Sequence, residues 1–180
     1  MAASRKIRTG SIDPTGEFPL AADDYVLHLL VAIHQLRDST LDGRLRSIGL
    51  NVGRYRLLGV LNRLGACSMT EVANFTAIDR TTLTRIADQL VSAGLVERKA
   101  DAKDRRQVLL EMTEAGLDCY AEAVTVVRNL NGKLLEDIPE DSRRATARVL
   151  RHLVEQLAPS AAARDGLLRV SREAGGAPKA

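Results

Sequence analysis

The chain contains 180 residues, with 26 Lys and Arg against 23 Asp and Glu, which gives a formal net charge of +3 at pH 7. Its composition, 45% hydrophobic, 27% charged and only 3% aromatic, is typical of a folded, largely helical protein and argues against both disorder and a β-sandwich. Because no apolar run could span a bilayer, no secretory signal is evident and only two cysteines occur, the sequence predicts a cytoplasmic protein with no membrane partner.

The N-terminal part of the chain changes from an irregular arm to a helical pattern. Residues 1–19 carry four glycine or proline residues and no apolar periodicity, so they are predicted to form a flexible arm. From Leu20 to about Gly49, apolar residues recur every three or four positions, the spacing of an amphipathic helix. A second helix is predicted for residues 52–64. The apolar stripe of the first helix consists of Val26, Leu29, Leu30, Ile33 and Leu36.

The next segment has the signals of two short helices in succession. Ser68 and Glu71 have the spacing of a capping box, in which each residue satisfies a free backbone N–H of the other, and they open a helix at about 69–76. Asp79 offers an N-cap for a second helix, and Gly94 offers its end. Two short helices joined by a tight turn form a helix-turn-helix.

A β-hairpin and two further helices are predicted for the rest of the chain. Residues 95–98 and 107–112 resemble short strands, and the polar loop between them allows them to pair. Helices are predicted for residues 113–137 and 140–157, followed by a flexible tail. The expected apolar stripes are Leu117, Tyr120, Val124, Val127 and Leu134 in the first of these helices, and Ala147, Leu150, Val154 and Leu157 in the second.

The second helix of the pair has a face suited to nucleic acid. When Leu83, Ile86 and Leu90 point inward, hydroxyl and guanidinium groups lie on the opposite side of the helix. Hydroxyls can contact phosphate or either type of base, and Arg can bind guanine through two hydrogen bonds. An isolated helix of this kind is more often an ordinary solvated face. The predicted contact residues are Arg80, Thr81, Thr82, Thr84 and Arg85.

The hairpin that follows makes the nucleic-acid interpretation the better one. A basic hairpin beside a helix that reads the major groove can enter the adjacent minor groove, where arginine is favoured. Asp104 lies two residues from Arg106 and is expected to brace its guanidinium. The predicted contact residues of the hairpin are Arg98, Lys99, Lys103, Asp104, Arg105 and Arg106.

These segments carry a family resemblance. The sequence IDRTTLTRIADQLVSAGLVER resembles the recognition helix and first wing strand of the MarR family of winged-helix transcriptional regulators, and DAKDRRQVLLEMTEAG resembles its wing signature. Ala102 stands where the family usually has Pro, and Met112 where it usually has Leu. The helices that flank this region are similar to the family's dimerisation helices in position and period.

The resemblance implies a mainly α-helical protein with a small β-hairpin wing. Residues 51–113 would form a winged helix-turn-helix that binds DNA, and residues 20–50 and 114–157 would form a dimerisation domain. Residues 158–180 would be a flexible tail. The homodimer would bind a pseudo-palindromic operator in double-stranded DNA as a repressor that a small ligand releases.

The resemblance also implies an effector site between the dimer helices and the DNA-binding lobe. Basic and aromatic side chains there would suit a small aromatic or carboxylate effector, although packing and solvent exposure would produce the same residues. The candidates are Tyr25, His28, His34, Arg46, Tyr55 and Arg56.

Three alternatives remain open. A thiol-based redox sensor on the same fold would use Cys67 or Cys119, but neither has a basic sequence neighbour that would lower its pKa, so both are expected to be buried apolar residues. A winged helix that binds protein and not DNA is the second alternative. An enzyme is the least favoured, because no nucleotide-binding motif or catalytic constellation is present. His28 and His34 do not share a helical face, so no metal site or cofactor is expected.

Overall fold

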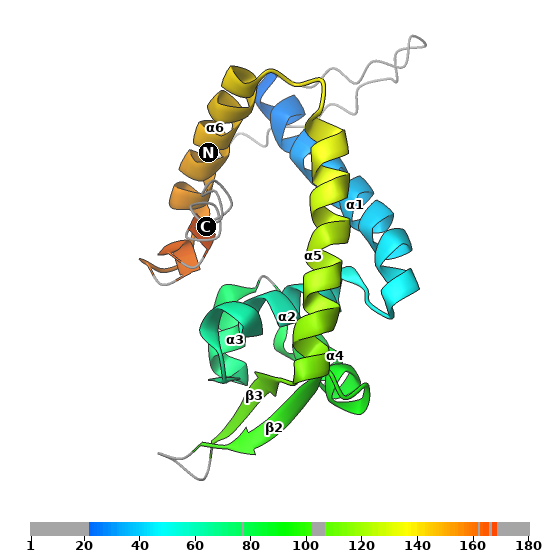
Figure 1. Cartoon of the computed structure of the whole chain (residues 1–180). Helices are drawn as coiled ribbons and strands as arrows, with labels where there is room; N and C mark the ends of the chain where they lie inside the picture. Colours follow the sequence, from blue (N-terminus) through cyan, green and yellow to red (C-terminus); the bar gives the residue numbers. More distant parts are fainter. Residues whose placement is uncertain (1–21, 77, 102–106, 162, 166, 169–180) are drawn as a thin grey trace, which may run out of the picture. The chain divides into compact units, whose positions relative to one another are not determined.

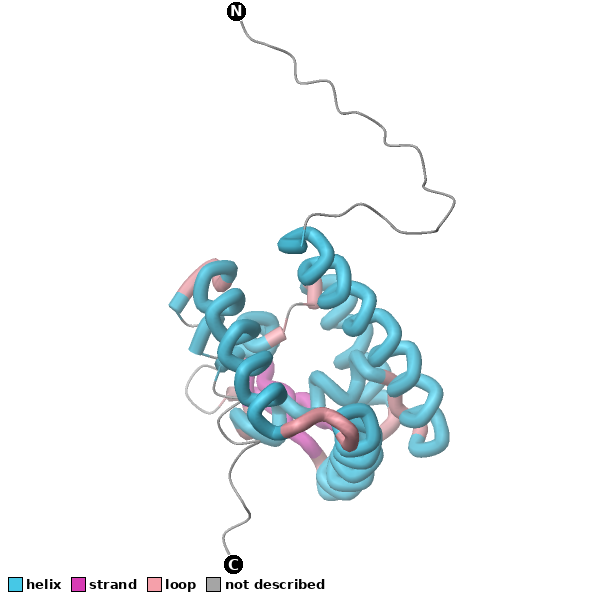
Figure 2. The backbone as a smooth tube through the Cα atoms, turned by 90° about the horizontal axis from the view of Figure 1, so that it is seen from above, coloured by secondary structure: helices cyan, strands magenta, loops and turns pink. Residues whose placement is uncertain are grey.

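A computed structural model describes residues 22–76, 78–101, 107–161, 163–165 and 167–168. The chain divides into two compact units, residues 1–39 and 40–180, and each is described by itself. As predicted, the protein is mainly helical with one small sheet (Figures 1 and 2). No helix in the described part of the chain combines the length and the apolarity needed to cross a membrane.

Helix α1 (Ala22–Leu45) begins in the first unit and ends in the second. Its predicted apolar stripe is exposed, since Leu29 and Ile33 retain 38% and 58% of their accessible surface. The helix ends in a 3-10 turn, η1 (Arg46–Ile48), and Gly49 stops this turn at a φ of 72°, a left-handed conformation that favours glycine. The predicted end near Gly49 is therefore confirmed.

Helix α2 (Val52–Leu64) has the predicted bounds and begins with two side-chain caps. The side chain of Asn51 accepts a hydrogen bond from the backbone N–H of Arg54 at 2.8 Å. The carboxylate of Asp42, from the end of α1, accepts another from the N–H of Val52 at 2.7 Å. Together they satisfy two of the backbone donors that every helix leaves free at its N-terminus.

Helices α3 (Met69–Phe75) and α4 (Arg80–Ser92) form the helix-turn-helix, and the predicted capping residues start them both. Ser68 and Glu71 form the complete capping box, and the backbone N–H of Ser68 donates to the Glu71 carboxylate at 2.8 Å. The carboxylate of Asp79 accepts from the N–H of Thr82 at 2.9 Å. Gly94, with a φ of 70°, turns the chain after α4.

The wing is an antiparallel sheet with the strand order β1–β3–β2. Figure 1 labels β2 and β3. Strands β2 (Val96–Ala100) and β3 (Val108–Met112) form the predicted hairpin, in which Val96 lies opposite Met112. A third strand, β1 (Cys67–Ser68), was not predicted, and it pairs with β3. A strand of two residues has no alternation to detect, so it arises from packing and not from a sequence pattern.

The core of the second unit joins the end of α1, the helix-turn-helix, the sheet and the next helix, α5 (Glu114–Leu135). Leucine dominates this core, as expected for a chain with few aromatic residues. Full burial of a leucine contributes roughly 1.5–3 kcal/mol, so the second unit has a substantial core of its own. The largest fully buried side chains are Leu41, Leu45, Leu57, Leu58, Leu61, Leu83, Leu90, Leu110, Val72 and Val96.

Helices α5 and α6 (Glu140–Leu157) use their apolar faces differently. Helix α5 buries Ala123, Val127 and Leu130, whereas two residues of its predicted stripe, Leu117 and Leu134, are 48% and 55% exposed. Helix α6 buries none of its residues within the single chain. Its stripe, predicted to be buried, is not: Ala147 and Leu157 are exposed, Leu150 is 37% exposed and Val154 is half-buried. Periodicity indicates an apolar face but does not identify what covers it.

Gly116 allows α5 to approach the chain just before β2, and we expect its replacement by Ala to destabilise the protein by about 1–3 kcal/mol. A Cβ atom at this position would lie 2.0 Å from the carbonyl oxygen of Leu95, so the backbone would have to move. Gly132 on the same helix has open space around it, and Gly132→Ala should stabilise the protein by about 0.5–1 kcal/mol. Urea unfolding of both variants tests this, and equal stability of the two would contradict the proposed close approach.

Candidate nucleic-acid interface

Helix α4 separates its apolar and polar residues as the sequence predicted. Leu83, Ile86 and Leu90 are buried. Arg80, Thr81, Thr84 and Arg85 are exposed, whereas Thr82 is half-buried at the edge of the face. The exposed side chains, together with Asp88, line an open recess of about 460 Å³. The hydroxyl of Thr84 donates to the carbonyl of Arg80 at 2.9 Å, so its hydrogen is used within the helix, and it can meet a ligand as an acceptor.

Arg98, a predicted contact residue of the wing, is held by the recognition helix. Its Nη2 lies 2.5 Å from Oδ1 of Asp88, and both side chains remain about half exposed. This ion pair ties strand β2 to α4. A nucleic acid that contacts Arg98 must therefore share or replace the carboxylate of Asp88.

Lys99 is held between two acidic side chains of the wing. Glu97 and Glu111 lie directly opposite each other in the register of β2 and β3, where like charges repel. The Nζ of Lys99 lies 2.8 Å from Glu97 and 2.5 Å from Glu111, so its positive charge offsets their mutual repulsion. Hydrogen bonds to Glu111 and Glu97 raise the pKa of Lys99 above its usual value. In this structure Lys99 therefore links the two strands of the hairpin.

The remaining predicted contact residues of the hairpin lie between β2 and β3 in the sequence. Lys103, Asp104, Arg105 and Arg106 lie outside the described residues. The proposed bracing of Arg106 by Asp104 therefore stays a prediction.

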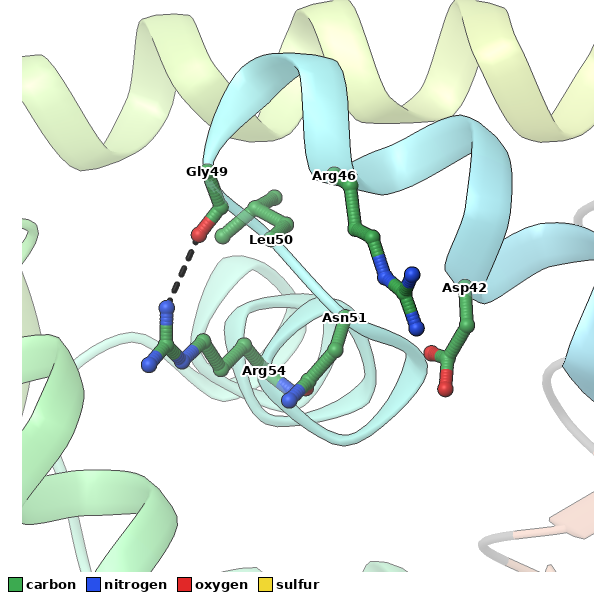
Figure 3. A pocket seen from close by; sticks show the side chains of 6 residues that line it. All are labelled: Asp42, Arg46, Gly49, Leu50, Asn51 and Arg54. Atoms are coloured by element: carbon green, nitrogen blue, oxygen red, sulfur yellow. Dashed lines mark hydrogen bonds between the residues drawn. The ribbon is translucent and has the colours of Figure 1, made fainter.

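A pocket of about 350 Å³ lies where η1 meets α2, and we call it the junction pocket (Figure 3). Arg54 closes one side, where its Nη1 donates to the carbonyl of Gly49 at 2.8 Å. The guanidinium of Arg46 points toward the carboxylate of Asp42 on the other side (Figure 3). The lining residues are Asp42, Arg46, Gly49, Leu50, Asn51 and Arg54.

Arg54 also contacts the recognition helix, a contact that sequence reasoning missed. Its Nε and Nη2 both donate to Oε1 of Gln89 on α4, at 3.3 and 3.2 Å. The two residues are 35 positions apart, so no local pattern could have indicated the pair.

The predicted effector residues have different surroundings. Arg46 lines the junction pocket. Tyr55 stacks on Tyr120, with ring centroids 5.7 Å apart, so its ring packs against the core. Arg56 is half-buried on α2. In the first unit, Tyr25, His28 and His34 are exposed on α1, and Nε2 of His34 lies 3.7 Å from Asp38.

Both thiols lie in surroundings that suppress reactivity. Burial, with a smaller effect from the charge of Glu71, raises the pKa of Cys67 to about 11. Burial and the charge of Glu122 also raise the pKa of Cys119, which is half-buried. Because the thiolate is the reactive form, both side chains should react slowly at neutral pH.

We therefore expect that replacing Cys67 and Cys119 together by Ala leaves DNA binding unchanged. Mild peroxide should release wild-type protein from DNA no better than it releases the double variant. Gel-shift titrations of both proteins, with and without peroxide, measure this. Selective release of the wild type would make the redox sensor the leading mechanism.

Comparison with known proteins finds relatives with this fold in the family that the sequence resembles. The profile of the MarR family matches residues 48–107. The chain is 25% identical over 150 residues to the transcriptional repressor NicR of Pseudomonas putida, which covers 83% of this chain and 95% of NicR. It is 26% identical over 118 residues to the repressor IacR of the same species, covering 66% of this chain and 71% of IacR.

Solved structures agree with these sequence relatives. The structure of BpsR from Bordetella bronchiseptica superposes with a TM-score of 0.65 at 26% identity, covering 72% of this chain and 98% of BpsR. The regulator RdhR, in complex with 2,4-dichlorophenol, superposes with a TM-score of 0.73 at 13% identity, covering 86% of this chain and 91% of RdhR, and this likeness shows the fold alone. With the helix-turn-helix, the capped helix α4 and the β wing, these similarities support a winged-helix transcriptional regulator of the MarR family.

Proposed function

We propose that this regulator is a homodimeric repressor that binds a pseudo-palindromic operator and is released by a small aromatic carboxylate. The observation that carries the DNA-binding part is the exposed face of α4. Arg80 and Arg85 lie there among threonine hydroxyls, beside an antiparallel wing. A guanidinium that reaches the major groove can recognise guanine through O6 and N7.

Homodimer formation is supported by the uncovered apolar surface of the single chain. Leu150 and Leu157 on α6 are 37% and 78% exposed, although the helix has a clear apolar face. A second copy would bury that face and supply a second recognition helix. Two-fold symmetry would then place the half-sites about one DNA turn, or 34 Å, apart.

The effector part of the proposal is supported by the junction pocket and by the relatives. The pocket has a volume of about 350 Å³, within the range of about 300–1,000 Å³ of small-molecule sites. Arg46 on its wall offers a cation to a carboxylate. BpsR, a structural relative, is regulated in its DNA binding by 6-hydroxynicotinic acid. An aromatic acid that binds in the junction pocket and weakens DNA binding would release this chain from its operator.

Selection of bound sequences from a random duplex pool tests the proposal. We expect a two-fold symmetric sequence to be enriched, with affinity that falls steeply as salt increases. Repeating the binding measurement with a panel of aromatic carboxylates, first with wild type and then with Arg46→Met, tests the effector site. Failure to enrich any duplex would contradict the function and leave the protein-binding winged helix in its place.

A further inference from the structure

One hydrogen-bonded pair joins the first helix of the DNA-binding lobe to the recognition helix. Arg54 on α2 donates twice to the side-chain oxygen of Gln89 on α4, at 3.3 and 3.2 Å. It donates a third time to the carbonyl of Gly49, at 2.8 Å. Both side chains are half-buried, so the guanidinium is held in one place between the two helices.

This pairing fixes which end of the Gln89 amide faces outward. Arginine can only donate hydrogen bonds, so the amide oxygen must face Arg54, and the amide nitrogen must face the opposite side. Arg54 itself has five N–H groups, three of which are used in these bonds. The polar groups of the pair that remain available to a ligand are therefore all hydrogen-bond donors.

The pair lies beside the face proposed to read DNA, at the edge of α4 that packs on α2. Gln89 is four positions after Arg85, and residues separated by four positions are neighbours on the same side of a helix. The rise between them along the axis is about 6 Å. A recognition helix that places Arg85 against base edges therefore places Gln89 and Arg54 one turn farther along. A helix in the major groove has phosphate backbone on both sides, since the groove is about 12 Å wide.

We propose that Arg54 and Gln89 form a phosphate-binding pair that anchors the recognition helix to the operator backbone. The proposal rests on the proposed DNA-binding function and adds α2 to the DNA-contacting elements. Arg54 supplies the positive charge, and the Gln89 amide nitrogen supplies a neutral donor whose direction Arg54 sets. Because the contacts within the pair hold both groups in the free protein, little side-chain entropy is lost when a phosphate binds.

One substitution, Gln89→Glu, distinguishes a phosphate-binding role of the pair from a purely structural role. Gln89→Glu replaces a neutral partner of Arg54 by a carboxylate, which strengthens the hydrogen bonds within the pair. It also removes the outward amide donor and adds a negative charge beside the phosphate. A structural role therefore predicts equal or better DNA binding by Gln89→Glu, whereas a phosphate-binding role predicts weaker binding.

The experiment measures affinity for the selected operator and for random duplex at several salt concentrations. Arg54→Met should weaken both complexes by about tenfold and reduce the salt slope by about one for each protomer. Gln89→Glu should weaken both at least about tenfold, without a lower thermal stability. Arg63→Met is the matched control: it removes an α2 arginine that instead lies over the Phe75 ring, and its affinity should equal that of wild type.

Operators with single uncharged methylphosphonate linkages complete the test. One linkage in each half-site should weaken wild type but leave Arg54→Met unaffected, because the variant has already lost that contact. Three results would each overturn the inference. Arg54→Met could keep the wild-type affinity and salt slope, or Gln89→Glu could bind as tightly as wild type. In the third, every methylphosphonate linkage would weaken wild type and Arg54→Met equally. Failure of wild type to bind any duplex would instead refute the proposed function, so the two failures are distinguishable.

Discussion

Replacing Arg85 by Ala should weaken the operator complex by about 1–3 kcal/mol for each half-site. Arg85 is exposed on α4 and lines the recess with Thr81 and Thr84. A two-hydrogen-bond contact with a guanine edge depends on the base, so the loss should be much smaller on random duplex. Preference should also relax at one or two symmetric positions of the operator. Competition titrations against operators substituted at single positions measure both effects.

Arg106→Ala is the variant to compare with Arg85→Ala. Arg106 is predicted to contact the minor groove, where binding depends mainly on the shape of the DNA. Arg106→Ala should weaken operator and random duplex by similar factors and reduce the salt slope by about one charge for each protomer. If Arg85→Ala also lost equal affinity on both duplexes, base reading by α4 and anchoring by the wing could not be separate roles.

The helices and the hairpin were predictable because their signals are local. Asp79 caps α4 and Ser68 caps α3 through bonds to residues three positions away, so both caps are visible in the sequence. Gly49 and Gly94 end helical segments in the left-handed conformation that glycine adopts readily. Such signals fix where an element begins and ends, whatever lies around it.

The partners of charged residues were not predictable, because they come together only in the folded chain. Arg98 was predicted to contact DNA, and the structure pairs it with Asp88, ten positions earlier. Arg54 lies 35 positions from Gln89, and no motif links the two residues. A sequence reports that a charge is present, whereas its pairing depends on how α2, α4 and the wing pack.

Ending the chain after Pro139 should remove dimerisation and lower operator affinity by about 100-fold or more, because one lobe cannot hold two half-sites at once. The deletion removes α6, which contributes no residue to the buried core of the second unit. The shortened protein should therefore keep a folded DNA-binding lobe and either become monomeric or aggregate through its exposed apolar faces. Sedimentation and gel-shift titration measure assembly and affinity together.

Two point substitutions test the same surface without shortening the chain. Leu150→Asp with Leu157→Asp places charges on the apolar face of α6 and should also give a monomer with about 100-fold weaker operator binding. His152→Asp adds a charge to an exposed position roughly opposite that face and should remain dimeric. Because none of these residues is buried in the single chain, none of the substitutions should lower the thermal stability of a protomer. A dimeric Leu150→Asp, Leu157→Asp protein with undiminished operator affinity would show that α6 does not form the interface.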